Sequence, residues 1–235
     1  MIEIEGLTLR YGAATVLDVP ELTVADGAVT YLLGLNGTGK TSLLRCVSGV
    51  LAPGAGSIRV DGAPVRAGHS TPPNLGVHLD YRAFDPRHTA RRHLRWIARA
   101  RGIAGSRVAA VLRLVDLESV ADRRLGRYSL GMLQRVGIAA ALLGEPRTLI
   151  LDEPVNGLDI AGILWLRELL RRLASDGVCV LVTSHLLDEV ERNADAIVVL
   201  GPGRVLAAEP LAALVAPGVR LEDAYLRLTG PVGAS

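Results

Sequence analysis

Lysine, aromatic residues and long apolar stretches are scarce in this chain. Of its 26 basic residues, 25 are arginine, and Lys40 is the one lysine. Aromatic residues make up 3%, so the core must be built from Leu, Val, Ile and Ala. The formal charge of +2 is too small to indicate a nucleic acid or an anionic membrane by itself. With 49% hydrophobic and 21% charged residues, the composition excludes disorder and favours a globular domain.

Membrane spans and paired cysteines are also missing. No uncharged apolar run approaches the ~18 residues that a membrane helix needs, and the first six residues lack the features of a signal peptide. We therefore expect a cytoplasmic protein, with any membrane role depending on a partner. Cys46 and Cys179 have no CxxC spacing, and we interpret both as small buried apolar residues.

The one lysine stands in a glycine-rich segment that fits the nucleotide-binding pattern GxxxxGK[ST]. Its residues are Gly34, Leu35, Asn36, Gly37, Thr38, Gly39, Lys40 and Thr41, followed by Ser42. A strand is predicted over 29–33 and a helix over 41–50, which is the context that this motif requires. Backbone N–H groups and the helix N-terminus would hold the β- and γ-phosphates. Lys40 would reach the terminal phosphates and Thr41 would bind Mg²⁺, so we expect all nine residues to bind nucleotide.

The hydrophobic pattern predicts an α/β protein. Alternation predicts strands over 2–9 and 16–24, and apolar runs predict strands over 57–60, 148–151, 178–183 and 196–200. Continuous apolar strands separated by helices are typical of a parallel sheet that is covered on both faces. Residues 80–145 have helical spacing and many arginines, so we interpret them as a helical subdomain inserted in the α/β core.

Two adjacent carboxylates follow a predicted buried strand. Asp152 would lie at the carboxyl edge of the sheet, where ligands bind in open α/β folds, and is a candidate ligand of Mg²⁺, directly or through water. Glu153 points differently and is the candidate general base that polarises an attacking water. The alternative, in which both carboxylates only add solubility, is weakened by the nucleotide motif.

Three further segments complete a pattern. Tyr128–Met132 precedes a helix predicted to begin near Leu133, Asn156–Asp159 follows the two carboxylates, and His185 follows the predicted strand 178–183. With the glycine loop and the Asp-Glu strand, these segments resemble, in order, the nucleotide-binding domain of ATP-binding cassette (ABC) transporters. The resemblance runs to about residue 205.

The resemblance implies a role for each motif. Residues 34–41 match Walker A and 149–153 match Walker B, while Asp159 belongs to the D-loop and His185 is the switch histidine. Tyr11 matches the aromatic residue that stacks on adenine. Ser129 and Gly131 match signature residues that contact the γ-phosphate of ATP on the other subunit. ATP and Mg²⁺ would thus lie between this chain and a second copy or a paralogous subunit.

The resemblance also implies the fold class and the domain plan. We expect an α/β P-loop core with a mostly parallel sheet, an N-terminal antiparallel β subdomain and an inserted α-helical subdomain. The whole chain, 1–235, would be one ABC ATPase domain, with 1–79 and 146–210 as the core, 80–145 as the helical subdomain and 211–235 as a short tail.

Several residues depart from the family pattern. Tyr128, Leu130 and Met132 replace Leu, Gly and Gln of the signature, and Asp80 stands where the Q-loop glutamine is usual. Asp80 can still offer oxygen to Mg²⁺ or to the lytic water, but it is shorter and charged. The acidic Asp80, the segment Gly131–Arg135 and the ending 221–226 resemble drug-export ATPases of the daunorubicin and bacitracin type. The expected function is ATP hydrolysis that drives a separate permease at the cytoplasmic face of the membrane, exporting a drug, antibiotic or other amphipathic compound.

Other interpretations remain open at this point. A non-transport ABC ATPase of DNA maintenance would need a long insertion for which the chain has no room, and translation-associated ones carry two cassettes. The later motifs argue against a small-molecule P-loop kinase. Arg87, Arg91, Arg95 and Arg99 would form one stripe on a helix. That stripe is a solvated face, or a surface for the permease or anionic headgroups; nucleic acid is not expected, since only Trp96 interleaves.

Overall fold

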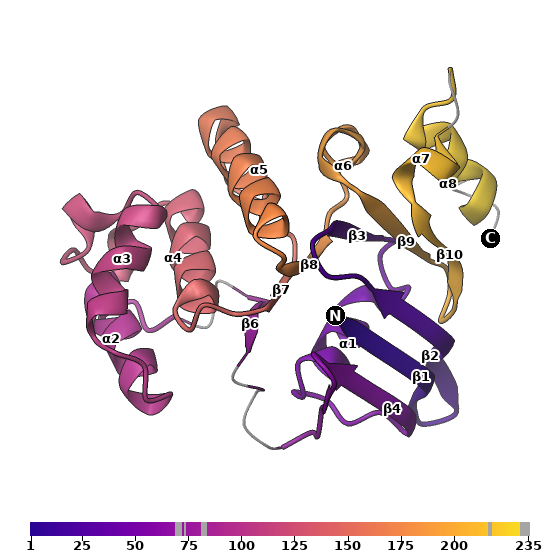
Figure 1. Cartoon of the computed structure of the whole chain (residues 1–235), viewed down its shortest axis with the longest axis horizontal. Coiled ribbons are helices and arrows are strands. Elements are labelled where there is room, and N and C mark those ends of the chain that lie inside the picture. The colour runs from indigo at the N-terminus through magenta and orange to yellow at the C-terminus, as the bar shows by residue number, and fades with distance from the viewer. Residues whose placement is uncertain (69–71, 73, 81–83, 216–217, 231–235) are drawn as a thin grey trace.

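A computed structural model describes residues 1–68, 72, 74–80, 84–215 and 218–230. Two β-sheets and several helices build the described part of the chain (Figure 1). The helical insertion, α2 to α4, lies beside β6 at one end of the larger sheet, and the N-terminal sheet lies near the other strands of that sheet. The predicted α/β class, with an antiparallel N-terminal part and inserted helices, is confirmed.

The N-terminal sheet is antiparallel and has the order β2-β1-β4-β5. Its strands are β1 (Ile2–Tyr11), β2 (Ala14–Val24), β4 (Ala55–Val60) and β5 (Ala63–Pro64). The buried residues of β1 alternate as Ile2 and Ile4 and, one residue out of step, as Leu7 and Leu9, because one face of this sheet packs on the core and the other meets solvent. The predicted strands 2–9, 16–24 and 57–60 are therefore present, each slightly longer.

The larger sheet has the order β10-β9-β3-β8-β7-β6 and is parallel except for β10. Its strands are β3 (Val29–Leu33), β6 (Leu75–His78), β7 (Thr148–Leu151), β8 (Cys179–Thr183), β9 (Ala196–Leu200) and β10 (Val205–Pro210). The apolar runs at β3, β7, β8 and β9 were predicted as strands. The sequence analysis missed β6 and β10, whose patterns are short or interrupted by Gly76 and Pro210.

Helices connect the strands and close the chain. They are α1 (Lys40–Val47), α2 (Ala90–Ala100), α3 (Ser106–Leu114), α4 (Leu130–Leu142), α5 (Ile160–Ser175), α6 (Leu187–Asn193), α7 (Leu211–Leu214) and α8 (Leu221–Thr229). Two 3₁₀ turns, Glu118–Val120 and Leu125–Arg127, join α3 to α4. Among the described residues, no helix is both long and apolar enough to cross a bilayer.

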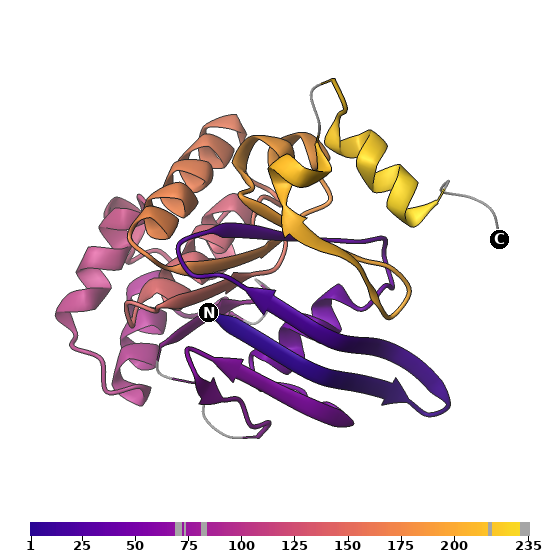
Figure 2. The ribbon, with the colours of Figure 1, turned by 45° about the vertical axis from the view of Figure 1, so that its right-hand side comes forward.

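The larger sheet separates two hydrophobic cores. Alternate residues of β3 point to opposite sides: Tyr31 and Leu33 pack with the helices, whereas Leu32 packs with α1 and the N-terminal sheet. Figure 2 shows the N-terminal sheet on one side of the larger sheet and α5 on the other. Burial on both faces explains why these strands are continuously apolar. The helical insertion contributes Leu94 and Leu112 to the core that covers the helix side.

Three boundaries differ from the predictions. α1 ends at Val47, not Val50, because Gly49 adopts φ +73° and its N–H caps the carbonyl of Cys46. α4 begins at Leu130, not near Leu133, so the signature-like residues form its first turn. Arg87 precedes α2 and does not belong to the predicted stripe.

The two cysteines are buried, and the predicted tail contains two helices. Cys46 and Cys179 are free and buried, and burial raises the pKa of both thiols to about 11, which fits their interpretation as apolar core residues. Within the predicted tail 211–235, α7 and α8 are helical, and 216–217 and 231–235 lie outside the described residues. Residues 81–83 of the predicted helical subdomain also lie outside them.

Candidate active site

The glycine loop runs from the end of β3 into α1 and lines a hollow of about 370 Å³. The residues that line the hollow are Val16, Asn36, Gly37, Gly39, Lys40, Thr41, Ser42, Asp152 and Glu153. Gly39 precedes the helix with φ +102°, and a Cβ there would meet the Leu17 side chain at 2.7 Å, so only glycine lets the loop pass this closely to β2. Within the described residues, no side chain caps α1, which leaves its first N–H groups available to an anion.

Lys40 is the first residue of α1, and its side chain curls back over the loop. Its Nζ donates to the carbonyl of Gly34 at 2.6 Å and to the carbonyl of Leu35 at 3.1 Å. Burial lowers the pKa of Lys40, although the charges of Glu153 and Asp152 act in the opposite direction. The ammonium is thus held by the loop's own carbonyls, in the same hollow as the two carboxylates that follow β7.

The Asp152 carboxylate links α1 to β8 through its two oxygens. Its Oδ2 accepts a hydrogen bond from the Thr41 hydroxyl at 3.2 Å, and its Oδ1 accepts one from the Thr183 hydroxyl at 2.6 Å. Thr183 ends β8 and is fully buried. The predicted pair Thr41–Asp152 is therefore brought together. The sequence analysis missed Thr183, although a hydroxyl at the end of a strand neighbouring β7 was a usable signal.

Glu153 has a left-handed backbone, with φ 48°, which is uncommon for a residue with a side chain. Three groups hold it: its N–H donates to Thr183 Oγ1 at 2.8 Å, its carbonyl accepts from Gln134 Nε2 at 3.4 Å, and its Oε2 lies 2.8 Å from His185 Nδ1. A strained backbone that is fixed on all sides is typical of functional residues. The structure thus brings together Glu153 and His185, two candidate residues that the sequence analysis named separately and without predicting their contact.

The side chain of Gln134, which contacts the Glu153 carbonyl, is itself hydrogen-bonded to the imidazole of His78. Gln134 on α4 is buried, and its Oε1 lies 2.6 Å from Nε2 of His78 at the end of β6. The His78 ring lies against Gly137, where any Cβ would overlap it. Burial lowers the pKa of His78, so the neutral ring donates Nε2–H to the Gln134 oxygen. Neither residue was predicted from the sequence.

The signature-like segment begins α4 and packs on the D-loop segment of the same chain. Ser129 caps α4 by accepting the Met132 N–H at 3.2 Å, and a Cβ at Gly131 would meet the Gly157 carbonyl at 2.7 Å. Asp159 caps α5 in the same way, accepting the Gly162 N–H at 2.7 Å. Among the described residues that line the hollow, none belongs to this segment. Ser129 and Gly131 are therefore not brought to the glycine loop of their own chain.

Other predicted residues lie around the rim. Tyr11 is the last residue of β1, pairs with Ala14 of β2 and is 54% exposed. Val16, two residues after Ala14, lines the hollow and was not predicted from the sequence. Asp80 is exposed and follows β6 by two residues. A second hollow of about 220 Å³ lies along the same loop. It is lined by Leu33, Gly34, Leu35, Asn36, Ser184, His185, Leu187 and Tyr225, so the C-terminal α8 also reaches the loop.

Comparison with known proteins agrees with this geometry. The family model described as "ABC transporter" matches residues 17–156. The bacitracin transport ATP-binding protein BcrA of Enterococcus faecalis is 37% identical over 209 residues, which cover 88% of this chain and 68% of that protein. The daunorubicin resistance ATP-binding protein DrrA3 of Streptomyces coeruleorubidus is 36% identical over 241 residues, covering 100% and 76%. A solved ATP-binding subunit of an ABC transporter superposes with a TM-score of 0.86 at 30% identity, covering 97% and 99%.

Proposed function

The chain belongs to the ABC transporter family, and from this premise we propose that it powers the export of an amphipathic drug or antibiotic through a separate permease. It is an ATP-binding subunit and hydrolyses ATP to ADP and phosphate. The similarity to the bacitracin and daunorubicin proteins supports export as the direction of transport. Such a subunit would sit at the cytoplasmic face of the membrane, attached through the permease.

The observation that carries the proposal is the junction of Glu153 with His185 beside the glycine loop. A carboxylate can only accept, so the 2.8 Å contact requires the proton of the imidazole to be on Nδ1. His185 would then orient Glu153, and Glu153 would take the proton of a water that attacks the γ-phosphate. Lys40 would neutralise the charge of the terminal phosphates.

The donor set at the mouth of α1 fits Mg²⁺. The Thr41 hydroxyl and the Asp152 carboxylate are hard oxygen ligands that already meet at 3.2 Å, and Mg²⁺ commonly takes one or two protein oxygens with phosphate and water as the rest. Asp80 is the third candidate, from the end of β6. When bound with ATP, the ion would neutralise charge on the phosphates. Thr183 would keep Asp152 aimed at that position.

The positions of Ser129 and Gly131 support a dimer in which two chains share each ATP. Both residues lie at the N-terminus of α4, where the helix dipole favours a phosphate. Since they do not line their own hollow, they would serve the nucleotide of a second copy or a paralogous subunit. Asp159 would approach that subunit from the adjacent segment, and Tyr11 would stack on adenine.

Replacing the general base tests this proposal. Glu153→Gln should slow hydrolysis roughly 10²–10⁴-fold while preserving ATP binding, so that ATP and Mg²⁺ hold two chains together. Size-exclusion chromatography with light scattering should show an ATP-dependent dimer. The matched control adds Ser129→Asp to this variant: aspartate caps α4 equally well but repels the phosphate, and the dimer should be lost with ATP binding intact. A double variant that dimerises as well as Glu153→Gln would refute the shared site.

Export itself is tested in cells. Expression of the chain together with its permease in a sensitive host should raise resistance to at least one amphipathic antibiotic, and Glu153→Gln should abolish the gain at equal protein level. Resistance that persists with the inactive subunit would separate the chain from export. Uptake of the compound, in place of expulsion, would reverse the proposed direction.

A further inference from the structure

Positive charge is concentrated in the helical part of the chain. Residues 84–145 contain twelve arginines against five acidic residues, a formal charge of +7, whereas the whole chain carries +2. The remainder is therefore net negative, with a balance of −5. An asymmetry of this size creates a positive surface field on one part of the molecule, although the total charge is small.

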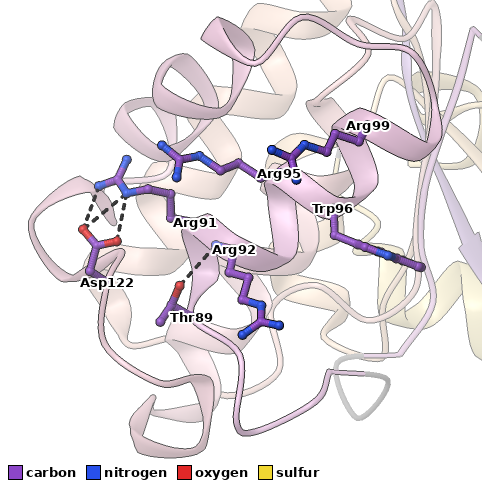
Figure 3. Close-up of a pocket in the computed structure, with 7 residues that line it drawn as sticks. All are labelled: Thr89, Arg91, Arg92, Arg95, Trp96, Arg99 and Asp122. Atoms are coloured by element: carbon purple, nitrogen blue, oxygen red, sulfur yellow. Dashed lines mark hydrogen bonds and ion pairs between the residues drawn. The ribbon is translucent and has the colours of Figure 1, made fainter.

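Helix α2 presents this charge on its outer side. Its inner side, with Ala90, Leu94 and Ala98, is buried in the core. The outer side carries three exposed arginines and an indole that is 65% exposed. We call these four residues, Arg92, Arg95, Trp96 and Arg99, the arginine face. With Thr89, Arg91 and Asp122 they line a shallow hollow of about 430 Å³ (Figure 3).

Among the described residues, the arginines of the arginine face have no direct partner, although the charge of Arg95 acts on Asp122. Arg91 is neutralised by Asp122, whose carboxylate accepts from Nε at 3.0 Å and from Nη2 at 3.2 Å. In the part of the chain that the structure describes, the side chains of Arg92, Arg95 and Arg99 make no hydrogen bond or ion pair. Figure 3 shows Arg91, Arg95 and Arg99 along one edge of α2 and shows Arg92 and Trp96 along the other edge. The three exposed arginines therefore all line the same hollow.

We propose that the arginine face binds the phosphate groups of anionic lipids, so that the chain touches the membrane surface directly. One guanidinium group can donate two parallel hydrogen bonds to the oxygens of a phosphate. Tryptophan prefers the boundary between headgroups and acyl chains. Basic residues near an anionic leaflet each add to the affinity. A protein partner is less favoured, because Trp96 is the only large apolar side chain among the described residues that line the hollow, and stable protein contacts need a buried apolar centre.

Nucleic acid is the other polyanion that this face must be tested against. Single-stranded nucleic acid is held by several aromatic platforms in a basic groove, whereas the arginine face offers one indole on a helix of 11 residues. The proposal goes beyond ATP hydrolysis and does not depend on it. ATP affinity therefore remains a separate measurement, and its loss would count against the proposed function alone.

Vesicle co-sedimentation of the full chain without a permease is the direct test. Binding to phosphatidylcholine vesicles that contain phosphatidylglycerol should exceed binding to phosphatidylcholine alone and should fall with salt. Each arginine should contribute about fivefold, so replacing the three arginines of the face with glutamine should weaken binding on the order of 100-fold. The matched control replaces Arg10, Arg59 and Arg66, exposed arginines outside the helical part, and should weaken it only a few-fold through net charge.

A second readout follows the indole. The emission of Trp96 should shift to shorter wavelength on anionic vesicles, and Trp96→Phe should remove the shift, since Trp165 is engaged under Arg135. Folding of every variant is checked by circular dichroism and ATP affinity. The proposal is overturned if the arginine-face variant binds anionic vesicles like the control variant, if neutral vesicles bind equally, or if RNA displaces the vesicles at the same charge concentration.

Discussion

Nε2 of His78 lies 2.6 Å from Oε1 of Gln134, and both side chains are buried. The pair links the end of β6 to α4, and through the Gln134 amide, 3.4 Å from the Glu153 carbonyl, it reaches the backbone of the proposed general base. α4 is the helix that begins with Ser129 and Gly131. One hydrogen-bond chain therefore joins three segments of the proposed site: the strand before Asp80, the signature-like helix α4 and the backbone of Glu153.

Breaking this chain should lower both stability and turnover. Gln134→Leu leaves the His78 N–H buried without an acceptor, which costs about 1–3 kcal/mol in the free energy of unfolding. The Glu153 backbone also loses one of the two side chains that hold it, so kcat should fall while KM for ATP changes little. Denaturant midpoints and steady-state ATPase rates measure the two effects. Leu133→Met, an apolar exchange on the same helix outside the signature-like segment, serves as the control and should leave kcat unchanged.

Acid should destabilise the fold through the same histidine. Burial lowers the pKa of His78 below its usual 6.5, against the opposing effects of Gln134, Asp80 and Asp152. Below pH 6.5 the unfolded chain then binds more protons than the folded chain, so stability is complete above this pH and falls as the pH drops below it. Burial also lowers the pKa of His93, which therefore contributes to the loss of stability in acid in the same direction. His78→Met should flatten the slope of unfolding free energy against pH; an unchanged slope would exclude His78 as its source.

Lys40 should not tolerate substitution by arginine. Its ammonium sits within 2.6 Å of the Gly34 carbonyl, a space that a planar guanidinium would overfill. Lys40→Ala should abolish tight ATP binding, and Lys40→Arg should bind and hydrolyse ATP poorly despite its equal charge. Titration with a fluorescent ATP analogue measures ATP binding by both variants, and steady-state ATPase rates measure their hydrolysis. Arg45→Ala, on the exposed side of α1, is the control. Normal hydrolysis by Lys40→Arg would contradict the assignment of a point charge at this position.

Asp80 should affect coupling to the permease more than ATP binding. It lies two residues beyond β6, whereas the phosphate contacts are expected from the glycine loop. Asp80→Asn should keep ATP affinity within a few-fold, but stimulation of hydrolysis by the reconstituted permease should fall, because a carboxylate near Mg²⁺ biases a moving loop through its charge. Equal stimulation in both proteins would make Asp80 a spectator.

The sequence predicted the elements whose signals are local. Four strands of the larger sheet follow from apolar runs, since burial on both faces forces such runs. The glycine loop, Asp152 and His185 follow from motifs with fixed spacing. By contrast, β6 contains Gly76, where a Cβ would overlap the Ala141 carbonyl on α4. That requirement comes from tertiary packing, and a single sequence does not reveal it.

The supporting residues of the site show the same limit. Thr183 and Gln134 contact Asp152 and Glu153 directly, and His78 supports them through Gln134, yet these three residues are 30, 19 and 75 positions from Glu153 in the chain. Their partners become neighbours only when β6, β7 and β8 pair and α4 packs on them. The start of α4 was placed three residues too late because Leu130 and Gly131 resemble a loop, whereas the Ser129 cap makes them the first turn.

The half-buried position of the one lysine has a consequence for how this protein can be handled. Apart from the amino group at the start of the chain, every amine-directed reagent has a single side-chain target, and burial that lowers its pKa leaves more of it in the reactive free-base form. Acylation of Lys40 would therefore report nucleotide occupancy, since bound phosphate would shield it. Amine-coupled sensor surfaces and amine cross-linkers would modify the residue that we propose contacts the ATP phosphates, so immobilisation should use an introduced surface cysteine.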